Sequence, residues 1–281
     1  MSRRIPAVLS IAGSDSGGGA GIQADLKAFA RCGVHGMTAV TALTAQNTTG
    51  VSAVHTTPPE MIVEQVRQVA GDIGVDAVKI GMLGTAETVR AVGAALDLLE
   101  PGTPIVIDPV MVAESGAVLL DDDARAAVVD LLLPRATVIT PNLPEARVLA
   151  GDTAAEADAE SLARALHRLG PDAVVVTGGH REEVTDIFFD GTTLETLSGT
   201  RHHDGAAHGS GCTHSSALAA HLALGHDPLD AARAARAIAS DAVRDGLREL
   251  GAGAGPVDVF GLRHRSRPGA PDPQRSATPL A

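Results

Sequence analysis

The sequence predicts an α/β fold: a mostly parallel, doubly wound sheet flanked by helices, with an antiparallel hairpin at one edge. Short runs of β-branched and apolar residues alternate with longer segments in which apolar residues recur at helical spacing. The predicted strands are apolar at almost every position, which is typical of parallel strands that helices cover on both faces. Late in the chain, Asp190-Gly191 separates two strand-like runs, which is the signal of a hairpin.

Each element follows from its local pattern. Residues 7–12 form a continuous apolar run typical of a buried strand, and the helix predicted at 22–31 carries apolar residues at helical spacing. Prolines open the helix predicted at 58–72, because the first turn of a helix tolerates a missing N–H. Pro101-Gly102 ends the helix predicted at 85–99. Further strands are predicted at 37–44, 77–80, 105–107, 137–139, 173–176, 184–189 and 193–197, and further helices at 121–132, 144–150, 155–169, 211–224 and 228–249.

The chain has 281 residues, a length that allows one large domain or two small ones. No segment between the predicted elements has the composition of a linker, so we expect one domain over residues 5–262. Residues 263–281 combine prolines with Arg, Ser and Gly and hold too few apolar groups to pack against a core. We therefore expect this segment to be a disordered C-terminal tail.

Composition excludes several classes of partner. With 34 acidic and 22 basic residues the formal charge is −12, which argues against general binding to nucleic acid or anionic membranes. Trp and Tyr are absent, so the chain offers few platforms on which bases could stack. No apolar run reaches the ~20 residues of a membrane-spanning helix. The two cysteines lack the spacing of a disulfide framework, which predicts a reducing, cytoplasmic compartment.

Polar and glycine-rich motifs follow the predicted strands. In a doubly wound sheet, ligands bind beyond the carboxyl ends of the strands, so these motifs predict a ligand site at that edge. They are Gly13–Gly21, Gln46-Asn47, Gly81-Met82, Asp108–Met111, Thr140–Glu145 and Thr177–His180.

The first glycine loop matches the dinucleotide pattern G-x-G-x-x-A at residues 19–24. That fingerprint also needs an acidic residue ~20 positions later, and no Asp or Glu occurs between Leu26 and Pro59. A plain turn before a helix is the favoured interpretation. A P-loop is excluded, because neither Lys27 nor Lys79 follows a glycine.

A second glycine motif opens the helix predicted at 211–224. Gly209, Ser210 and Gly211 allow backbone amides to converge, and the N-terminus of a helix attracts phosphate. Cys212 follows in the first turn, where we expect its thiolate to be favoured. The alternative is a glycine-rich turn with a buried cysteine.

Asp108 and Glu145 place carboxylates at two strand ends. Mg²⁺ bound to nucleotide phosphates typically uses one or two carboxylates together with waters, so this pair predicts a magnesium site. Taken singly, each residue also fits a helix cap or a solvated loop charge.

Histidines crowd the segment around Cys212, which leaves two further alternatives. The histidines are His202, His203, His208 and His214. A zinc site is one alternative, although neither C-x-x-C nor H-E-x-x-H spacing occurs. A hydrolase with Cys212 as nucleophile and a histidine as base is the other.

The ordered motifs resemble those of hydroxymethylpyrimidine/phosphomethylpyrimidine kinases of the ribokinase superfamily. The resemblance extends over about residues 5–262. The matching segments are Ile11–Lys27, Thr41–Asn47, Val78–Leu83, Asp108–Met111, Thr140–Glu145 and Gly209–Thr213.

This resemblance implies a ribokinase-like homodimer that uses ATP and Mg²⁺. It implies phosphorylation of 4-amino-5-hydroxymethyl-2-methylpyrimidine, and then of its monophosphate to the diphosphate, in thiamine biosynthesis. The implied pyrimidine contacts are Gly13, Asp25, Gln46, Met82 and Val110. The implied catalytic group is Cys212, with Gly209, Ser210 and Gly211 around the phosphoryl group. The implied nucleotide contacts are Asn142, Glu145, Thr177 and Gly179, with Asp108 and Glu145 near Mg²⁺.

The side-chain chemistry agrees with this assignment. The Gln46 amide matches the adjacent donor and acceptor of an aminopyrimidine, and Met82 and Val110 can cover the ring. A Cys212 thiol with a lowered pKa would take or polarise the proton of the substrate hydroxyl.

Two positions depart from the family pattern. Thr177 stands where a lysine is common, and Glu114 stands where lysine or a small residue is common. A lost cation near the triphosphate would weaken binding or transfer by about 1–3 kcal/mol. A pyridoxal or pyridoxine kinase of the same superfamily, and a catalytically weakened pyrimidine-binding relative, therefore remain alternatives.

Overall fold

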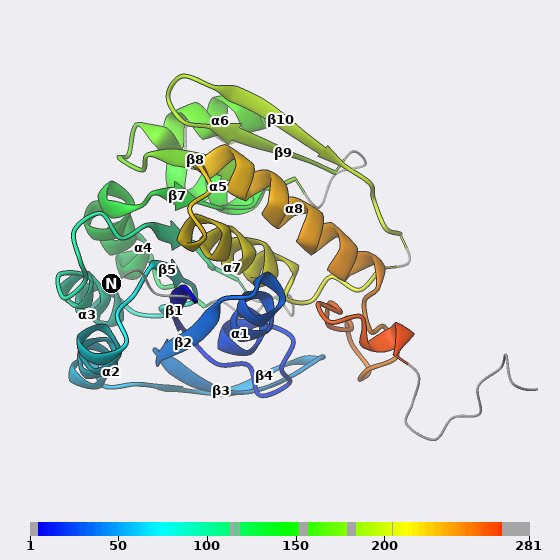
Figure 1. Ribbon diagram of the computed structural model, residues 1–281, viewed down its shortest axis with the longest axis horizontal. Coiled ribbons are helices and arrows are strands. Elements are labelled where there is room, and N and C mark those ends of the chain that lie inside the picture. The colour runs from blue at the N-terminus through cyan, green and yellow to red at the C-terminus, as the bar shows by residue number, and fades with distance from the viewer. Residues whose placement is uncertain are drawn as a thin grey trace, which may run out of the picture.

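The computed structural model describes residues 5–112, 116, 119–151, 157–178, 184–203 and 205–265. An eight-stranded sheet forms its centre, in the order β10-β9-β8-β7-β6-β5-β1-β2 (Figure 1). The strands are β1 (Ala7–Ala12), β2 (His35–Val40), β5 (Ala77–Ile80), β6 (Ile105–Ile107), β7 (Val138–Ile139), β8 (Ala173–Val176), β9 (Val184–Phe189) and β10 (Leu194–Gly199). Within this sheet β2, β1, β5, β6, β7 and β8 pair in parallel, whereas β9 and β10 run antiparallel at the edge, so the predicted α/β fold and edge hairpin are confirmed.

Helices cover both faces of this sheet. The helices are α1 (Gly21–Cys32), α2 (Pro59–Asp72), α3 (Ala86–Leu96), α4 (Asp122–Ala127), α5 (Leu143–Ala150), α6 (Ala159–His167), α7 (Ser210–Ala223) and α8 (Pro228–Arg244). One apolar cluster packs α1, α7 and α8 against the sheet, and a second cluster packs α2 to α6 against the other face. Figure 1 shows α1, α7 and α8 lying across the near face. Because successive residues of a strand face opposite ways, Leu9 and Val78 join the second cluster while Val8 and Ala77 join the first.

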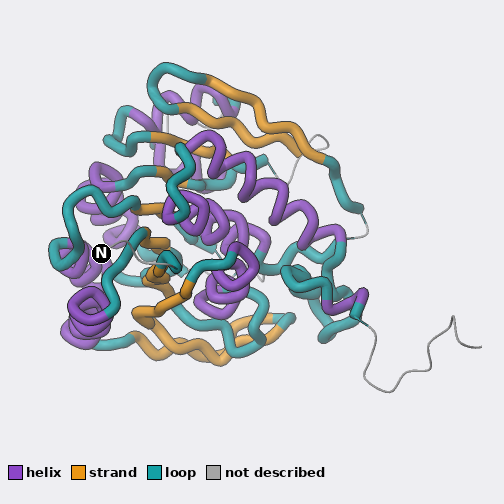
Figure 2. The backbone as a smooth tube through the Cα atoms, viewed as in Figure 1, coloured by secondary structure: helices purple, strands orange, loops and turns teal. Residues whose placement is uncertain are grey.

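The strand predicted at 37–44 is wrong in its extent. The chain leaves the main sheet after β2, and Ala42–Asn47 forms β3, which pairs antiparallel with β4 (Gly50–Thr56) in a separate two-stranded sheet at the end near β2 (Figure 2). Thr41 marks the break: its amide bonds Ala12 of β1 (3.0 Å), and its hydroxyl bonds the Met82 carbonyl (2.8 Å). Gln46 therefore ends a strand of the small sheet rather than of the main one.

Several predicted helix ends shift. The helix predicted at 155–169 begins only after Asp158, whose carboxylate accepts a bond from the Ser161 amide (2.8 Å) and caps the helix. The helix predicted at 228–249 ends at Arg244. A 3₁₀ turn, Leu262–His264, closes the described chain, and residues 266–281 of the expected tail lie outside the described residues.

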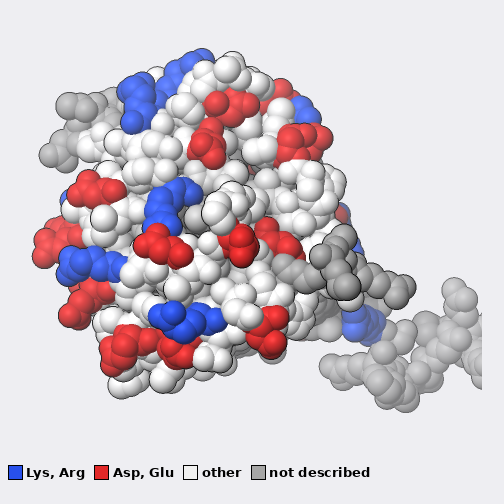
Figure 3. All heavy atoms as spheres, turned by 60° about the vertical axis from the view of Figure 1, so that its left-hand side comes forward, with Lys and Arg blue, Asp and Glu red and all other residues white. Residues whose placement is uncertain are grey.

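Two surface properties bear on partners. In the part of the chain that the structure describes, no helix combines the length and apolar composition that a membrane crossing requires. On the face in Figure 3, acidic and basic side chains are intermixed. That face therefore presents no extended basic patch to a nucleic-acid backbone.

Candidate active site

The N-terminal tip of α7 lies at the carboxyl ends of the parallel strands. Gly209 caps the helix with φ +84°, a left-handed conformation that favours glycine, and a Cβ there would collide with the Gly19 carbonyl. The Ser210 amide bonds Ala207 (2.9 Å), which removes it from the predicted set of phosphate donors. Within the described ranges, no protein group bonds the amides of Gly211 and Cys212. These two amides are the ones that remain to bind an anion.

The thiol of Cys212 does not have the lowered pKa that the sequence suggested. Burial raises its pKa to about 12, and Asp108 and Asp25 add to the rise, although Lys79 and the backbone amide of Gly21 oppose it. Burial of the thiol is the largest of these effects, and it outweighs the opposing charge of Lys79. Cys212 is therefore a neutral thiol at physiological pH.

A fully buried lysine lies beneath this thiol. Lys79 projects from β5 toward α7, and its Nζ lies 3.0 Å from Asp25 Oδ1 and 3.8 Å from Asp108 Oδ2. Burial alone would lower the pKa of Lys79, but Asp25, Cys212 and Asp108 together raise it above its ordinary value. Lys79 therefore stays charged. Lys79 lies within the matched segment Val78–Leu83, but the sequence did not predict it as a site residue.

The carboxylates of this ion cluster also bind α7. The Ser216 hydroxyl donates to Asp25 (2.7 Å), and the Ser215 hydroxyl donates to Asp108 (3.0 Å). On the sheet side, Ser10 of β1 donates to Asp25 (2.6 Å). The cluster thus joins α1, the sheet and α7 directly below the helix tip.

Asp25 is therefore not the pyrimidine contact that the resemblance implied. Its side chain has no exposed surface, and its oxygens are taken by Lys79, Ser216 and Ser10. A ligand cannot reach it without breaking the cluster. The sequence prediction for Asp25 is wrong because this carboxylate, which α1 carries, neutralises the buried Lys79.

Asp108 and Glu145 lie close enough to influence each other, as predicted. Burial raises the pKa of Glu145 to about 8, and the Asp108 carboxylate is the next largest cause. Burial also raises the pKa of Asp108, against the opposing effect of Lys79. Two desolvated carboxylate groups that disfavour each other's charge form a donor set that suits a divalent cation. These residues fit Mg²⁺.

The predicted nucleotide contacts gather around the start of α5. Asn142 and Glu145 form a capping box: Asn142 Oδ1 accepts the Glu145 amide and Glu145 Oε2 accepts the Asn142 amide, both at 2.9 Å. Thr177 pairs with Asn142 across the β7 and β8 ends. Gly179 and Glu114 lie outside the described residues.

Two predicted pyrimidine contacts, Met82 and Gln46, adjoin the first glycine loop (residues 13–21), which contains a third, Gly13. The Met82 side chain covers Gly13, since a Cβ at that glycine would collide with Cε of Met82. The backbone amide of Gln46 donates to the Ser16 hydroxyl (2.8 Å), and that hydroxyl donates to the backbone carbonyl of Gln46 (2.7 Å). Met82 and Val110 are half-buried, so each keeps apolar surface that a ligand can cover.

The first glycine loop binds its own carboxylate. Asp15 accepts the amides of Gly17 (2.8 Å), Gly19 (3.0 Å) and Ala20 (2.8 Å). The amides that a dinucleotide pyrophosphate would need are therefore already occupied. The dinucleotide alternative is contradicted on this ground.

The zinc and hydrolase alternatives gain no support. Among the residues that the structure describes, no three His, Cys, Asp or Glu side chains gather as metal ligands. The groups that shift the Cys212 pKa are Lys79, two carboxylates and a backbone amide, and none is a histidine. His208 bonds Asp15 (3.0 Å), and His202 bonds Ser240 (3.0 Å).

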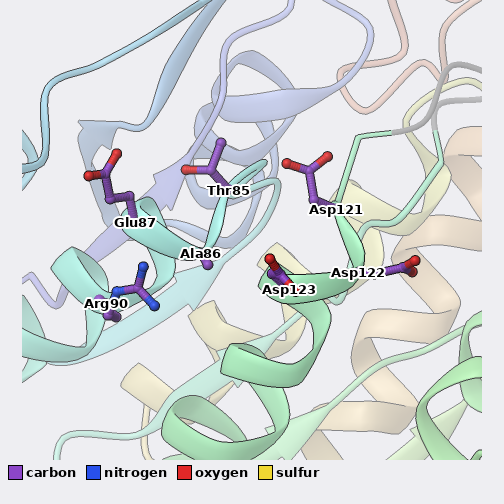
Figure 4. Close-up of a pocket in the computed structure, with 7 residues that line it drawn as sticks. All are labelled: Thr85, Ala86, Glu87, Arg90, Asp121, Asp122 and Asp123. Carbon is purple, nitrogen blue, oxygen red and sulfur yellow. The ribbon is translucent and has the colours of Figure 1, made fainter.

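Two hollows adjoin this edge of the molecule. One, of about 310 Å³, is lined by Gln46, Asn47, Thr48, Thr49, His208, Gly253 and Ala254. The other, of about 510 Å³, lies between the N-termini of α3 and α4 (Figure 4) and is lined by Thr85, Ala86, Glu87, Arg90, Asp121, Asp122 and Asp123. The second contains none of the predicted site residues, and its carboxylates would repel a phosphate. The candidate site is therefore the region between the α7 tip and Gln46.

Replacing the buried ammonium tests the ion cluster. Lys79→Met is expected to lower the free energy of unfolding by about 3–5 kcal/mol, because it leaves buried carboxylates without their cation. Urea unfolding at neutral pH measures this. Lys27→Met changes the one other lysine, which is half-buried, and should cost far less. Equal losses in the two variants would contradict the cluster's role.

Comparisons with known proteins agree with this geometry. A family model described as phosphomethylpyrimidine kinase matches residues 15–258. A hydroxymethylpyrimidine/phosphomethylpyrimidine kinase of Rhizobium meliloti is 49% identical over 257 residues, which cover 90% of this chain and 96% of that protein.

Solved structures agree as well. The pyridoxal kinase from Staphylococcus aureus in complex with AMP-PCP and pyridoxal has a TM-score of 0.83 at 33% identity, over 93% of this chain and 96% of that one. A phosphomethylpyrimidine kinase from Clostridium difficile has a TM-score of 0.74 at 37% identity, over 85% of this chain and 99% of that one. The fold is ribokinase-like, and the chain belongs to the phosphomethylpyrimidine kinase family of phosphate-transferring enzymes.

Proposed function

We propose that this enzyme uses ATP to phosphorylate 4-amino-5-hydroxymethyl-2-methylpyrimidine, and then its monophosphate to the diphosphate, in thiamine biosynthesis. The observation that carries the proposal is the tip of α7, where two unbonded amides and the Cys212 thiol stand above a buried ion cluster. The similarity to hydroxymethylpyrimidine/phosphomethylpyrimidine kinases supports the choice of substrate.

In this proposal the pyrimidine lies beside Gly13 and against the side chains of Met82 and Val110. Their apolar surfaces cover the two faces of the ring, and the Gln46 side-chain amide recognises the exocyclic amine and the neighbouring ring nitrogen. The hydroxymethyl group then points toward Cys212. The neutral thiol holds the hydroxyl in line for transfer, and does not act as a preformed base.

ATP would lie along the ends of β7 and β8. Asn142, Thr177 and Gly179 are the proposed contacts, and Asp108 and Glu145 would hold Mg²⁺, which supplies charge neutralisation at the phosphates when bound. The amides of Gly211 and Cys212 would stabilise the charge on the migrating phosphoryl group. The bond from the terminal phosphorus to ADP breaks as the bond to the substrate oxygen forms, and the proton of the substrate hydroxyl passes to the transferred phosphate group.

A pyridoxal kinase is the second candidate function. The high similarity to a pyridoxal kinase solved with pyridoxal favours it, and Thr177 favours a catalytically weakened pyrimidine binder. A coupled assay of ADP release across hydroxymethylpyrimidine, its monophosphate and pyridoxal separates them by kcat/KM. We expect both pyrimidines to rank above pyridoxal. Binding without ADP release would support the weakened binder.

We further propose a cytoplasmic homodimer formed through the small sheet. Cys32 and Cys212 are both free thiols, as a reducing compartment requires. The outward face of β3 and β4 carries exposed Leu43, Ala45 and Ala53, and Leu43 is 55% exposed. An apolar face of this kind suits a second copy of the chain.

Substituting the thiol tests its position. Cys212→Ala is expected to reduce kcat by about tenfold to a hundredfold, because the acceptor hydroxyl loses its orientation, while the Kd for the pyrimidine stays nearly constant. Steady-state kinetics and calorimetry measure the two quantities. Cys32→Ala, which changes the other cysteine of the chain and lies in α1, serves as the control. An unchanged kcat would leave Cys212 with a packing role only.

Restoring the missing cation tests the nucleotide site. Thr177→Lys is expected to lower the KM for ATP or raise kcat, by an amount equivalent to about 1–3 kcal/mol. Thr192→Lys adds the same charge in the exposed β9–β10 turn and should change neither. Indifference to Thr177→Lys would mean that another cation already fills this role.

A charge on the small sheet tests the dimer. Leu43→Glu is expected to convert a dimer into a monomer in light scattering, since it places a carboxylate in an apolar contact. Leu224→Glu alters another exposed leucine, at the end of α7, and should leave the mass unchanged. A monomeric parent protein would refute the proposed interface.

A further inference from the structure

Asp15 is buried in the first glycine loop, and its carboxylate forms hydrogen bonds both within that loop and to a residue outside it. Its Oδ1 accepts the Gly17 amide, and its Oδ2 accepts the amides of Gly19 and Ala20. The same Oδ2 lies 3.0 Å from Nε2 of His208, a residue 193 positions later. Burial alone would raise the pKa of Asp15, but the bonds from His208, Ala20 and Gly17 outweigh it, so the pKa lies below its usual range. The carboxylate is therefore charged, and both of its oxygens accept hydrogen bonds.

His208 directly precedes the cap of α7. Its ring packs so closely on Gly19 that a Cβ there would collide with it, and its backbone pairs with Gly255 (3.3 Å) and Val257 (3.1 Å) on the other side. One residue later, Gly209 packs against the Gly19 carbonyl. The His208 ring and the helix cap therefore pack against the same residue of the first glycine loop.

Further contacts join the same two segments. The backbone amide of Gly21 lies close enough to the Cys212 thiol to lower its pKa, so the end of the first glycine loop also lies beside the α7 tip. His208 and Gln46 both line the cavity of about 310 Å³. The proposed pyrimidine contacts and the proposed phosphoryl contacts thus meet at the Asp15–His208 pair.

We propose that Asp15 is a positioning residue that acts through His208: the pair fixes the turn carrying the Gly211 and Cys212 amides relative to the loop that holds the acceptor substrate. This inference rests on the proposed kinase function. Phosphoryl transfer needs the acceptor oxygen and the phosphoryl donors in one geometry, and displacement by about 1 Å can cost a hundredfold in rate. The pair sets that distance by joining the two segments.

Kinetics of variants test the proposal. Asp15→Asn replaces one acceptor oxygen by a donor, so it is expected to lower kcat about tenfold to a hundredfold while the KM for the pyrimidine changes by less than about threefold. His208→Ala should give a similar loss. His208→Gln should restore most of the rate, because its amide nitrogen can reach the place of Nε2. The double variant Asp15→Asn/His208→Ala should be no slower than the slower single variant, since the contact between the two residues is already lost in each single variant.

A matched control removes the same kind of carboxylate elsewhere. Asp227 caps α8 by accepting the amides of Leu229 and Asp230, both at 3.0 Å, beyond the C-terminal end of α7. Asp227→Asn should leave kcat unchanged. A rise in the KM for the pyrimidine alone in the His208 variants would instead make His208 a substrate contact. Additive losses of kcat in the double variant would show that Asp15 and His208 act independently. Either result would overturn the proposal.

Hydrogen exchange decides the question without turnover. Amides within residues 208–214 should exchange faster in Asp15→Asn and His208→Ala than in the parent, and His208→Gln and Asp227→Asn should match the parent. Should Asp15→Asn fail to fold, the two His208 variants carry the test. If the parent phosphorylates neither pyrimidine, the proposed function fails and the exchange data still judge the pair. Unchanged exchange at 208–214 would contradict the inference even in an active enzyme.

Discussion

The ion pair between Lys79 and Asp25 is the interaction on which the active-site edge depends. Both side chains have no exposed surface, and such a pair is tolerated only where further hydrogen bonds complete it. Ser10 and Ser216 supply those bonds, and Asp108 brings Ser215 into the same cluster. Because Ser215 and Ser216 belong to α7, neutralising one buried ammonium also fixes the helix whose tip faces the ligand.

This arrangement explains how the two glycine-rich segments of the chain differ in use. In the first loop, the amides fold around Asp15 and are satisfied within the protein. At the α7 tip, Gly211 and Cys212 keep their amides for an outside anion. Burial of the thiol, together with the carboxylates below the tip, keeps Cys212 neutral. The site is therefore built to orient and to stabilise charge, which is the main demand of phosphoryl transfer.

The sequence predicted the fold well because the spacing of apolar residues and the local composition can be read from short segments of the chain. The apolar strands β1, β5 and β8 were placed correctly by their runs alone, and so was the edge hairpin by Asp190-Gly191. The division of β2 from β3 was missed, since it depends on the bonds that Thr41 makes to Ala12 and Met82, which are distant in sequence.

The site was predictable only in part for the same reason. Position after a strand identified Asp108, Glu145 and Met82, and the structure gathers them at one edge. Nothing local distinguishes Lys79 within its apolar strand, and a lone lysine there carries no motif. Its partner Asp25 was assigned to the substrate because the chain alone does not reveal which carboxylate is enclosed. The pKa of Cys212 was misjudged because the helix terminus is visible in the sequence, whereas the burial of the thiol and the carboxylates below it are not.

A crystal structure with a non-hydrolysable ATP analogue tests the central claim most directly. The account predicts that oxygens of the terminal phosphate lie within about 3 Å of the backbone nitrogens of Gly211 and Cys212, above the undisturbed Lys79 cluster. A terminal phosphate bound elsewhere, against the amides of the first glycine loop or in the acidic hollow between α3 and α4, would contradict it.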